Sequence, residues 1–199
     1  MTTIKKPMGR VAYDEVQSKK GAIRLQAFTN ALAADADLIL NDESINGAAH
    51  SVTTFLAQPD FARNLTVVAS GAATGDVVVT GTNIRGDIIT ETLALNGNTP
   101  VVGNKAFKTV TSVAVPQVSS TTIDLGIGVK LGLDRKMPAA AVLDAYADGV
   151  RETTAATVAF SATAIESNTV STNTAPNGTR DFIVAFITAE ITNANQTTA

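Results

Sequence analysis

Residues 76–115 constrain the fold more than any other part of the chain. They contain three apolar segments rich in β-branched residues, at 77–80, 88–95 and 106–115. The first two flank a turn at 83–87, and Asn96-Gly97 turns the chain toward the third. An Asn-Gly pair between apolar runs is the strongest short-range signal for a β-hairpin. The stretch therefore predicts a β-meander, and it contains no residue pattern typical of a reaction centre.

The segment 88–95 shows how such a strand would be buried. Its apolar and threonine side chains alternate, which indicates a strand with one buried face. Glu91 interrupts the apolar face, and the sequence leaves open whether it lies at a rim or pairs with Arg85 or a lysine. In 107–115 the apolar positions change parity, which predicts a β-bulge.

Beyond this stretch, strands are expected where short apolar runs lie between turn signals. The expected strands are 50–56, 64–69, 138–146 and, from its alternation, 158–164. The run 182–187 is apolar at every position, so that strand should be buried on both faces, either inside a sandwich or at a subunit interface. Asp148-Gly149 predicts a hairpin turn. Apolar residues at 22–40 fit helix and strand spacing equally badly, so the structure of this part stays open.

The domain organisation is predicted from composition. Residues 1–30 hold a cluster of basic side chains, which are Lys5, Lys6, Arg10, Lys19, Lys20 and Arg24. Such a segment is either a solvated leader or an arm that lies across an acidic surface, nucleic acid, a partner or a neighbouring copy. We predict an N-terminal arm at 1–40, a β-rich domain at 41–192 and a flexible tail at 193–199, with the Ser/Thr-rich connection 116–122 dividing the domain into two sheets or subdomains. The predicted fold class is mainly β, an antiparallel β-sandwich or jelly-roll-like domain with meander hairpins and an extended N-terminal arm.

Length and charge limit the classes of partner. The chain has 199 residues, enough for one sizeable β-domain or two small ones. Its formal net charge is −3, whereas a nucleic-acid-binding protein normally has an excess of Lys and Arg, so no nucleic-acid partner is expected. No apolar run approaches the roughly 20 residues of a membrane-spanning helix, and the N-terminus lacks a signal-peptide pattern. We therefore expect no membrane partner and synthesis in a cytoplasm.

Two short motifs point to binding functions but have simpler explanations. Glycines between branched residues at 126–132 look like a phosphate-binding loop, yet the segment matches neither the GxGxxG nor the P-loop pattern. Arg85-Gly86-Asp87 spells the tripeptide that integrins bind, but it lies where a hairpin needs glycine. Neither motif is therefore assigned a ligand.

No catalytic, cofactor-binding or metal-binding residue is predicted. The chain has no cysteine, and His50 is its single histidine, so a triad or metal site could contain at most this one histidine, and its nearest acidic neighbour in sequence is Glu43. The carboxylate pairs Asp35/Asp37 and Asp42/Glu43 lack the spacing of a calcium loop and are expected in surface turns. We predict that the protein is not an enzyme. A glycosidase needs two facing carboxylates, and the sequence singles out no such pair.

Four segments resemble structural proteins of tailed bacteriophages. They are 55–60 with 63–67, 75–83, 86–97 and 105–110, and residues 81–97 and 105–110 match the pattern GTxxxGxxxTETLxLNG…KAFKTV that recurs in proteins encoded among virion morphogenesis genes. The similarity extends over about residues 50 to 170. It implies a capsid decoration (cement) protein or, less often, a neck, tail or baseplate component, and no catalytic residues come with it.

The expected function is that of a decoration protein that binds the outside of an assembled head and stabilises it. Its expected partners are the major capsid protein and further copies of itself, with a trimer favoured. Its expected location is the virion, after synthesis in the bacterial host cytoplasm. The alternative is a tail, neck or baseplate protein, or a host-recognition or carbohydrate-binding module. The last would need exposed aromatic side chains, of which only Tyr13, Tyr146 and seven phenylalanines are available.

Overall fold

Apolar residues in short alternating runs form fourteen β-strands in the computed structural model, which describes residues 23–140 and 142–188. The strands are β1 (Ile23–Phe28), β2 (Asp35–Ser44), β3 (His50–Val52), β4 (Arg63–Ala69), β5 (Thr74–Thr82), β6 (Ile88–Asn96), β7 (Val101–Phe107), β8 (Thr109–Val115), β9 (Thr122–Gly132), β10 (Val142–Ala147), β11 (Val150–Arg151), β12 (Thr157–Ala159), β13 (Thr169–Ser171) and β14 (Phe182–Ile187). One 3-10 turn, η1 (Ile165–Ser167), precedes β13. Strands account for 55% and helix for 2%, and the sheets are antiparallel, which confirms the predicted mainly-β, sandwich-like fold class.

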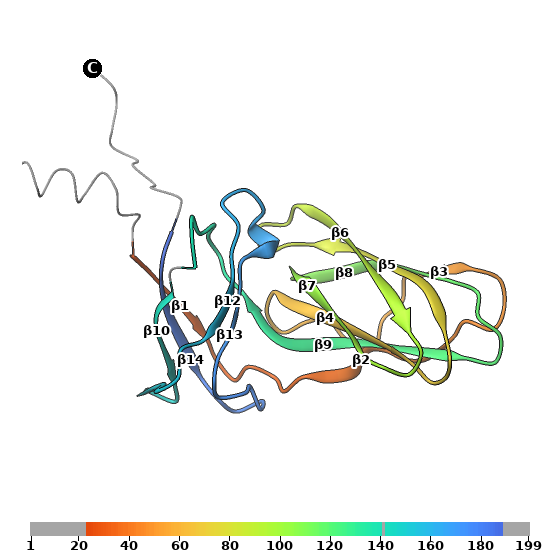
Figure 1. The fold of residues 1–199 in the computed structure, drawn as a ribbon, viewed down its shortest axis with the longest axis horizontal. Coiled ribbons are helices and arrows are strands. Elements are labelled where there is room, and N and C mark those ends of the chain that lie inside the picture. The colour runs from red at the N-terminus through yellow and green to blue at the C-terminus, as the bar shows by residue number, and fades with distance from the viewer. Residues whose placement is uncertain (1–22, 141, 189–199) are drawn as a thin grey trace, which may run out of the picture.

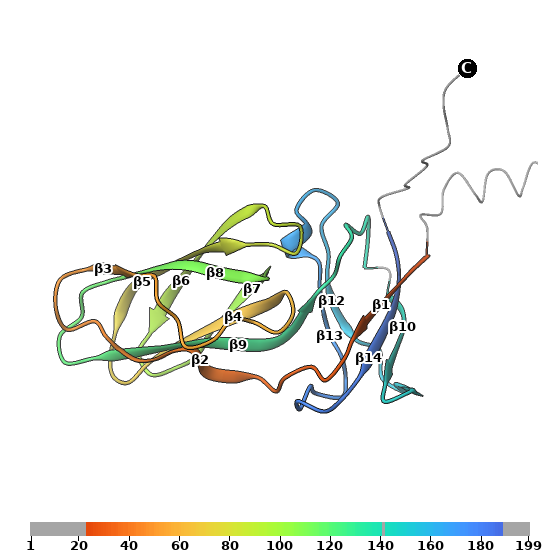
Figure 2. The same cartoon turned by 180° about the vertical axis from the view of Figure 1, so that it is seen from behind.

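The strands build three sheets. A six-stranded sheet has the order β12-β13-β9-β4-β7, with β2 also paired to β9. The β5 sheet has the order β3-β8-β5-β6, and the β14 sheet has the order β1-β14-β10-β11. The six-stranded sheet and the β5 sheet face each other as a sandwich, and the β14 sheet lies at one end of the molecule, where both views place it (Figures 1 and 2).

The sheets enclose two hydrophobic cores that share one strand. The larger core fills the sandwich, and the smaller lies between the β14 sheet and the adjoining end of the six-stranded sheet. β9 runs through both, with Leu125 and Ile127 buried in the larger core and Leu131 in the smaller. The two parts of the molecule are therefore joined by a continuous strand (Figure 1).

The hairpin within 76–115 is confirmed, but the third segment is divided between two sheets. β5 and β6 pair along their whole length. β7 then pairs with β4, and after Lys108 the chain returns as β8 on the other side of β5. Gly81 permits this crossing, because a Cβ there would lie 2.0 Å from the Thr109 carbonyl oxygen. The predicted bulge is present in β8, where the register skips one residue between Val110 and Ser112.

The N-terminal part of the described chain is paired in the sheets. Residues 23–40 are not part of an arm, since β1 pairs with β14 and β2 with β9. The local sequence could not show this, because the partner of β1 is β14, at the opposite end of the sequence. The rest of the predicted arm, 1–22, and the predicted tail, 193–199, lie outside the described residues. Residues 116–121 connect β8 to β9 and so pass from the β5 sheet to the six-stranded sheet.

Two expected strands are shorter than the sequence indicated. Only His50–Val52 of 50–56 and Thr157–Ala159 of 158–164 are in strands. In the first case a side chain replaces strand pairing, because Gln58 accepts the N–H of Val110 at 2.7 Å and donates to its carbonyl at 3.1 Å. The strand expected at 64–69 is confirmed as β4, and of the strand expected at 138–146 only the part from Val142 onward is present, as β10.

Candidate functional site

Glu91 joins the two sheets of the sandwich. The sequence left open whether this residue lies at a rim or pairs with Arg85 or a lysine, and the structure shows it bonded to backbone N–H groups of β7. It lies on the same face of β6 as the buried Leu93, and its carboxylate accepts the backbone N–H groups of Asn104 at 2.7 Å and Lys105 at 3.2 Å. Gly103 provides the room, since a Cβ there would lie 2.6 Å from Glu91 Oε2. Glu91 of the TETL part of the phage-like pattern is thus hydrogen-bonded to Lys105 of the KAFKTV part.

The chain crossing next to Gly81 is held by further residues of the same pattern. The hydroxyl groups of Thr82 and Thr109 are 2.6 Å apart and hydrogen-bonded. Lys108 Nζ donates to the Asp60 carbonyl at 2.8 Å, and Phe107 is fully buried. Each of these side chains therefore stabilises the crossing between β7 and β8.

Arg63 is a fully buried cation at the junction of the two cores. Its guanidinium donates to the carbonyls of Leu32 at 2.8 Å and Gly128 at 2.7 Å, and to the Asp60 carboxylate at 3.1 Å. Burial lowers the pKa of Arg63, and the charge of Asp60 opposes this shift. The side chain holds the loop between β1 and β2 onto β4 and β9, and nothing in the sequence distinguishes it from the exposed arginines.

The Arg85-Gly86-Asp87 tripeptide forms the exposed tip of the β5–β6 hairpin. Asn83 organises the turn, because its Oδ1 accepts the N–H groups of Arg85 at 2.8 Å and Asp87 at 3.1 Å, and its Nδ2 donates to the Asp87 carboxylate at 3.1 Å. Gly86 has φ of +88°, the left-handed region that favours glycine. The predicted turn chemistry is confirmed.

The glycine-rich segment 126–132 belongs to a strand and not to a loop. A Cβ at Gly126 would lie 1.8 Å from the Asp35 carbonyl oxygen, and one at Gly128 would lie 2.3 Å from Asn64 Nδ2. These glycines are required by the close approach of β2 and of a buried asparagine side chain. The segment has no geometry that would hold a phosphate.

His50 and the carboxylates singled out in the sequence lie at the surface. His50 Nε2 is 3.0 Å from Glu43 Oε1, and this contact, followed by the one to the Ala48 carbonyl, raises the pKa of His50. Hydrogen bonding and repulsion from Asp35 raise the pKa of Asp37. Within residues 23–140 and 142–188, no three His, Cys, Asp or Glu side chains are grouped so that they could hold a metal ion.

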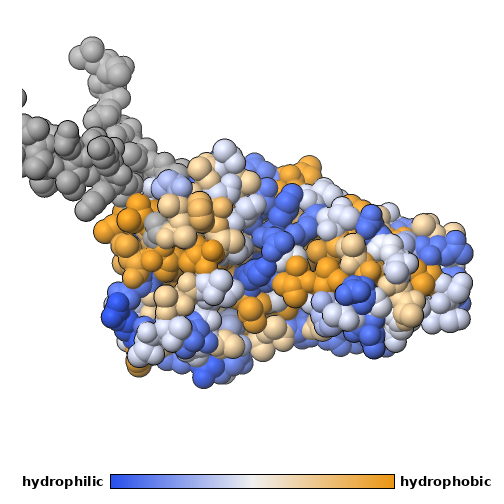
Figure 3. Space-filling model, in the orientation of Figure 1, coloured by the Kyte–Doolittle hydropathy of each residue, from blue (hydrophilic) through white to orange (hydrophobic). Residues whose placement is uncertain are grey.

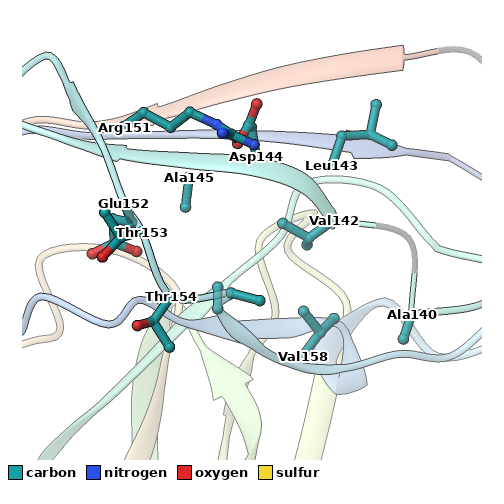
Figure 4. A pocket seen from close by; sticks show the side chains of 12 residues that line it. Ala140, Val142, Leu143, Asp144, Ala145, Arg151, Glu152, Thr153, Thr154 and Val158 are labelled. Atoms are coloured by element: carbon teal, nitrogen blue, oxygen red, sulfur yellow. The ribbon is translucent and has the colours of Figure 1, made fainter.

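A pocket of about 390 Å³ opens between the β10–β11 hairpin and β12 (Figure 4). It is lined by Ala140, Val142, Leu143, Asp144, Ala145, Arg151, Glu152, Thr153, Thr154, Ala155, Ala156 and Val158. Figure 4 shows Val142 and Val158 pointing toward the cavity, with Arg151 and Asp144 at its rim. The sequence predicted the hairpin at Asp148-Gly149 but not the cavity beside it.

The charged groups of the pocket are hydrogen-bonded within the protein. Asp144 Oδ1 lies 2.5 Å from Arg151 Nε, and this hydrogen bond raises the pKa of Arg151. The Glu152 carboxylate accepts the N–H groups of Asn173 at 3.0 Å and Thr174 at 2.6 Å. No aromatic side chain is among the described residues that line the cavity. The pocket can admit a small molecule, and its two carboxylates are hydrogen-bonded to Arg151 and to the backbone of Asn173 and Thr174.

Comparison with known proteins gives no significant match: no family model, no curated protein and no solved structure matches the chain. Among the helices of the described residues, none has the length and apolar character needed to cross a membrane.

Proposed function

We propose that this protein is a structural component of a tailed-phage particle, and specifically a capsid decoration protein that binds the outside of the assembled head. One observation carries the proposal. Several residues of the phage-like pattern have structural roles where the two sheets meet: Glu91 links β6 to β7, and Gly81, Phe107 and Lys108 lie at the crossing from β7 to β8. A pattern employed in this way supports a shared architecture rather than a shared reaction.

The decoration role needs binding energy and no chemistry. A protein that binds only the assembled shell shifts the equilibrium toward that shell. The proposed partners are the major capsid protein and further copies of this chain, in a homo-oligomer that we expect to be a trimer. The basic residues at 1–22 have the opposite sign to the net charge of the chain, so we propose that this segment contacts the head or a neighbouring subunit.

Binding to heads that lack the protein tests this function. Purified full-length chain is mixed with assembled heads from a phage deleted for its gene, and with unassembled capsid subunits as the control. We expect saturable co-sedimentation with the heads, no binding to free subunits, and heads that resist heat better once bound. Absence of binding to the heads would overturn the decoration role.

A variant without residues 1–22 tests the arm separately. The deletion ends before Ile23, so the pairing of β1 with β14 is kept, whereas a longer cut would remove β1. We expect the shortened chain to show the same circular dichroism spectrum and weaker binding to heads. Undiminished binding would refute the arm while leaving the decoration role intact.

The alternative of a carbohydrate-binding module has one supporting feature, the pocket beside Arg151. Sugar sites usually present an aromatic face, and the described lining has none. A glycan array with the full chain distinguishes the two functions, because the decoration role predicts no specific hit.

A further inference from the structure

One face of the β14 sheet is apolar and uncovered. The inner face packs on the smaller core through Phe182, Val184 and Phe186, which are fully buried. The outer face carries Ile23, Leu25, Ala27, Leu143, Ile183, Ala185 and Ile187, together with Asp144 and the half-buried Tyr146 on β10. Four of its large apolar side chains are exposed, to 68% for Ile23, 63% for Leu25, 48% for Leu143 and 43% for Ile183. Apolar side chains gather at this end of the molecule (Figure 3).

The register makes these side chains one continuous surface. Ile23 lies opposite Ile187, Leu25 opposite Ala185, and Ala27 opposite Ile183, so the three pairs share a face. On β10 the register shifts between Val142 and Asp144, and the extra residue is Leu143. Figure 4 shows Leu143 on the side opposite to Val142, so the irregularity adds a leucine to the outer face.

The face contains no uncompensated charge. β1 and β14 together have one charged residue, Arg24, which lies on the inner face and bonds to Asp134 at 2.6 Å. On the outer face, Asp144 and Arg151 pair with each other. In an antiparallel sheet with one face in solvent, the residues on that face are usually polar or charged. This face has no polar or charged residue on its two apolar strands, as expected for a surface that is covered in the working protein.

We propose that a second copy of this chain covers the outer face of the β14 sheet, which is turned toward the axis of the oligomer and packs on the same face of its neighbours. This inference rests on the proposed homo-oligomer. Charge favours a copy as the occupant: two chains of net charge −3 repel each other, and this neutral face lets them meet without burying a lone charge. A different protein would normally be selected by complementary charges, which the face does not offer.

The dimensions of the face make it the apolar centre of a larger self-contact. Three six-residue strands of the sheet form a face of roughly 20 Å by 14 Å, or roughly 280 Å². This is close to the largest apolar patch of a typical monomer, roughly 300–600 Å², so a stable contact of roughly 800 Å² per partner would include residues around this face. Two copies can stack such faces as in a β-sandwich, and three can converge around a threefold axis.

Sedimentation velocity of full-length Leu25→Glu, with Ile88→Glu as the matched control, tests the contact. Leu25 is 63% exposed and Ile88 is 80% exposed, but Ile88 begins β6 of the β5–β6 hairpin and is not part of the β14 sheet. We expect the wild type and Ile88→Glu to form the same oligomer. Leu25→Glu should dissociate about 100-fold more readily, because association would desolvate an unpaired carboxylate.

A charge-rescue experiment separates a self-contact from a general loss of folding. Leu25→Glu and Leu25→Lys should each be monomeric alone and should associate when mixed, because the two faces then carry opposite charges. A monomeric wild type, in which residues 1–22 or 189–199 cover the face, would overturn the inference, as would an unchanged oligomer in Leu25→Glu. Head binding by a monomeric wild type would refute this contact but not the decoration role.

Discussion

Replacing Arg63 by methionine should destabilise the protein strongly although no surface contact changes. Methionine fills similar space but donates no hydrogen bond, so the carbonyls of Leu32 and Gly128 and the carboxylate of Asp60 lose their partner. Breaking a buried ion pair by removing one member costs about 3–5 kcal/mol. Asp60 keeps the N–H of Leu32 at 2.8 Å and its side chain is 15% exposed, so the lower end, about 3 kcal/mol, is expected.

Urea unfolding followed by circular dichroism measures this loss, since the chain has no tryptophan for fluorescence. With an m-value of about 2 kcal/mol per molar urea, the midpoint should fall by about 1.5 M. Arg151→Met is the matched control, because Arg151 also pairs with an aspartate but its side chain is 66% exposed, and its midpoint should change by less than about 0.5 M. Equal shifts in the two variants would refute the argument that burial makes Arg63 important.

Three further predictions concern the sandwich and its surface. Glu91→Ala should lower the free energy of unfolding by about 2 kcal/mol, because two backbone N–H groups lose a charged acceptor; an unfolding midpoint equal to that of wild type would contradict this role. Gly81→Ala should be more damaging, since its Cβ would overlap the carbonyl of the crossing chain, and soluble protein of wild-type stability would refute the crossing. Contact with Glu43 raises the pKa of His50 above 6.5, so its stabilisation is complete below that pH and is lost as pH rises through the higher value. The melting temperature of wild type relative to His50→Gln should therefore stay constant at pH values below 6.5 and fall as the pH rises above it, and a difference that does not change with pH would contradict it.

Local patterns predicted the hairpins of this fold. Asn96-Gly97 ends β6, and Gly97 has φ of +58°. Asp148 and Gly149 have φ of +51° and +78° and join β10 to β11 as expected. These turns could be predicted because their geometry depends on residues that are adjacent in the chain.

Non-local pairing could not be predicted in the same way. β1 is a strand because β14 offers it a partner more than 150 residues later, and its own spacing shows no preference. The break at Lys108 depends on β4, which draws β7 into another sheet, so the local pattern indicated only a bulge. The roles of Arg63 and Glu91 could not be predicted for the same reason, because each hydrogen-bonds to backbone groups that are distant in the sequence.

For the β14 sheet, the sequence prediction holds for one face only. The sequence predicted that 182–187 would be buried on both faces, inside a sandwich or at a subunit interface. The described chain buries one face and leaves Ile183 exposed on the other. The contact between copies that we propose would bury this second face.

The most direct test of the proposed function is the copy number of this protein in purified virions, measured by quantitative mass spectrometry relative to the major capsid protein. A decoration protein should be nearly stoichiometric with the capsid subunits or present at a simple fraction of them. A copy number of a few dozen or fewer would assign the protein to the neck, tail or baseplate, and its absence from virions would contradict a structural role in the particle.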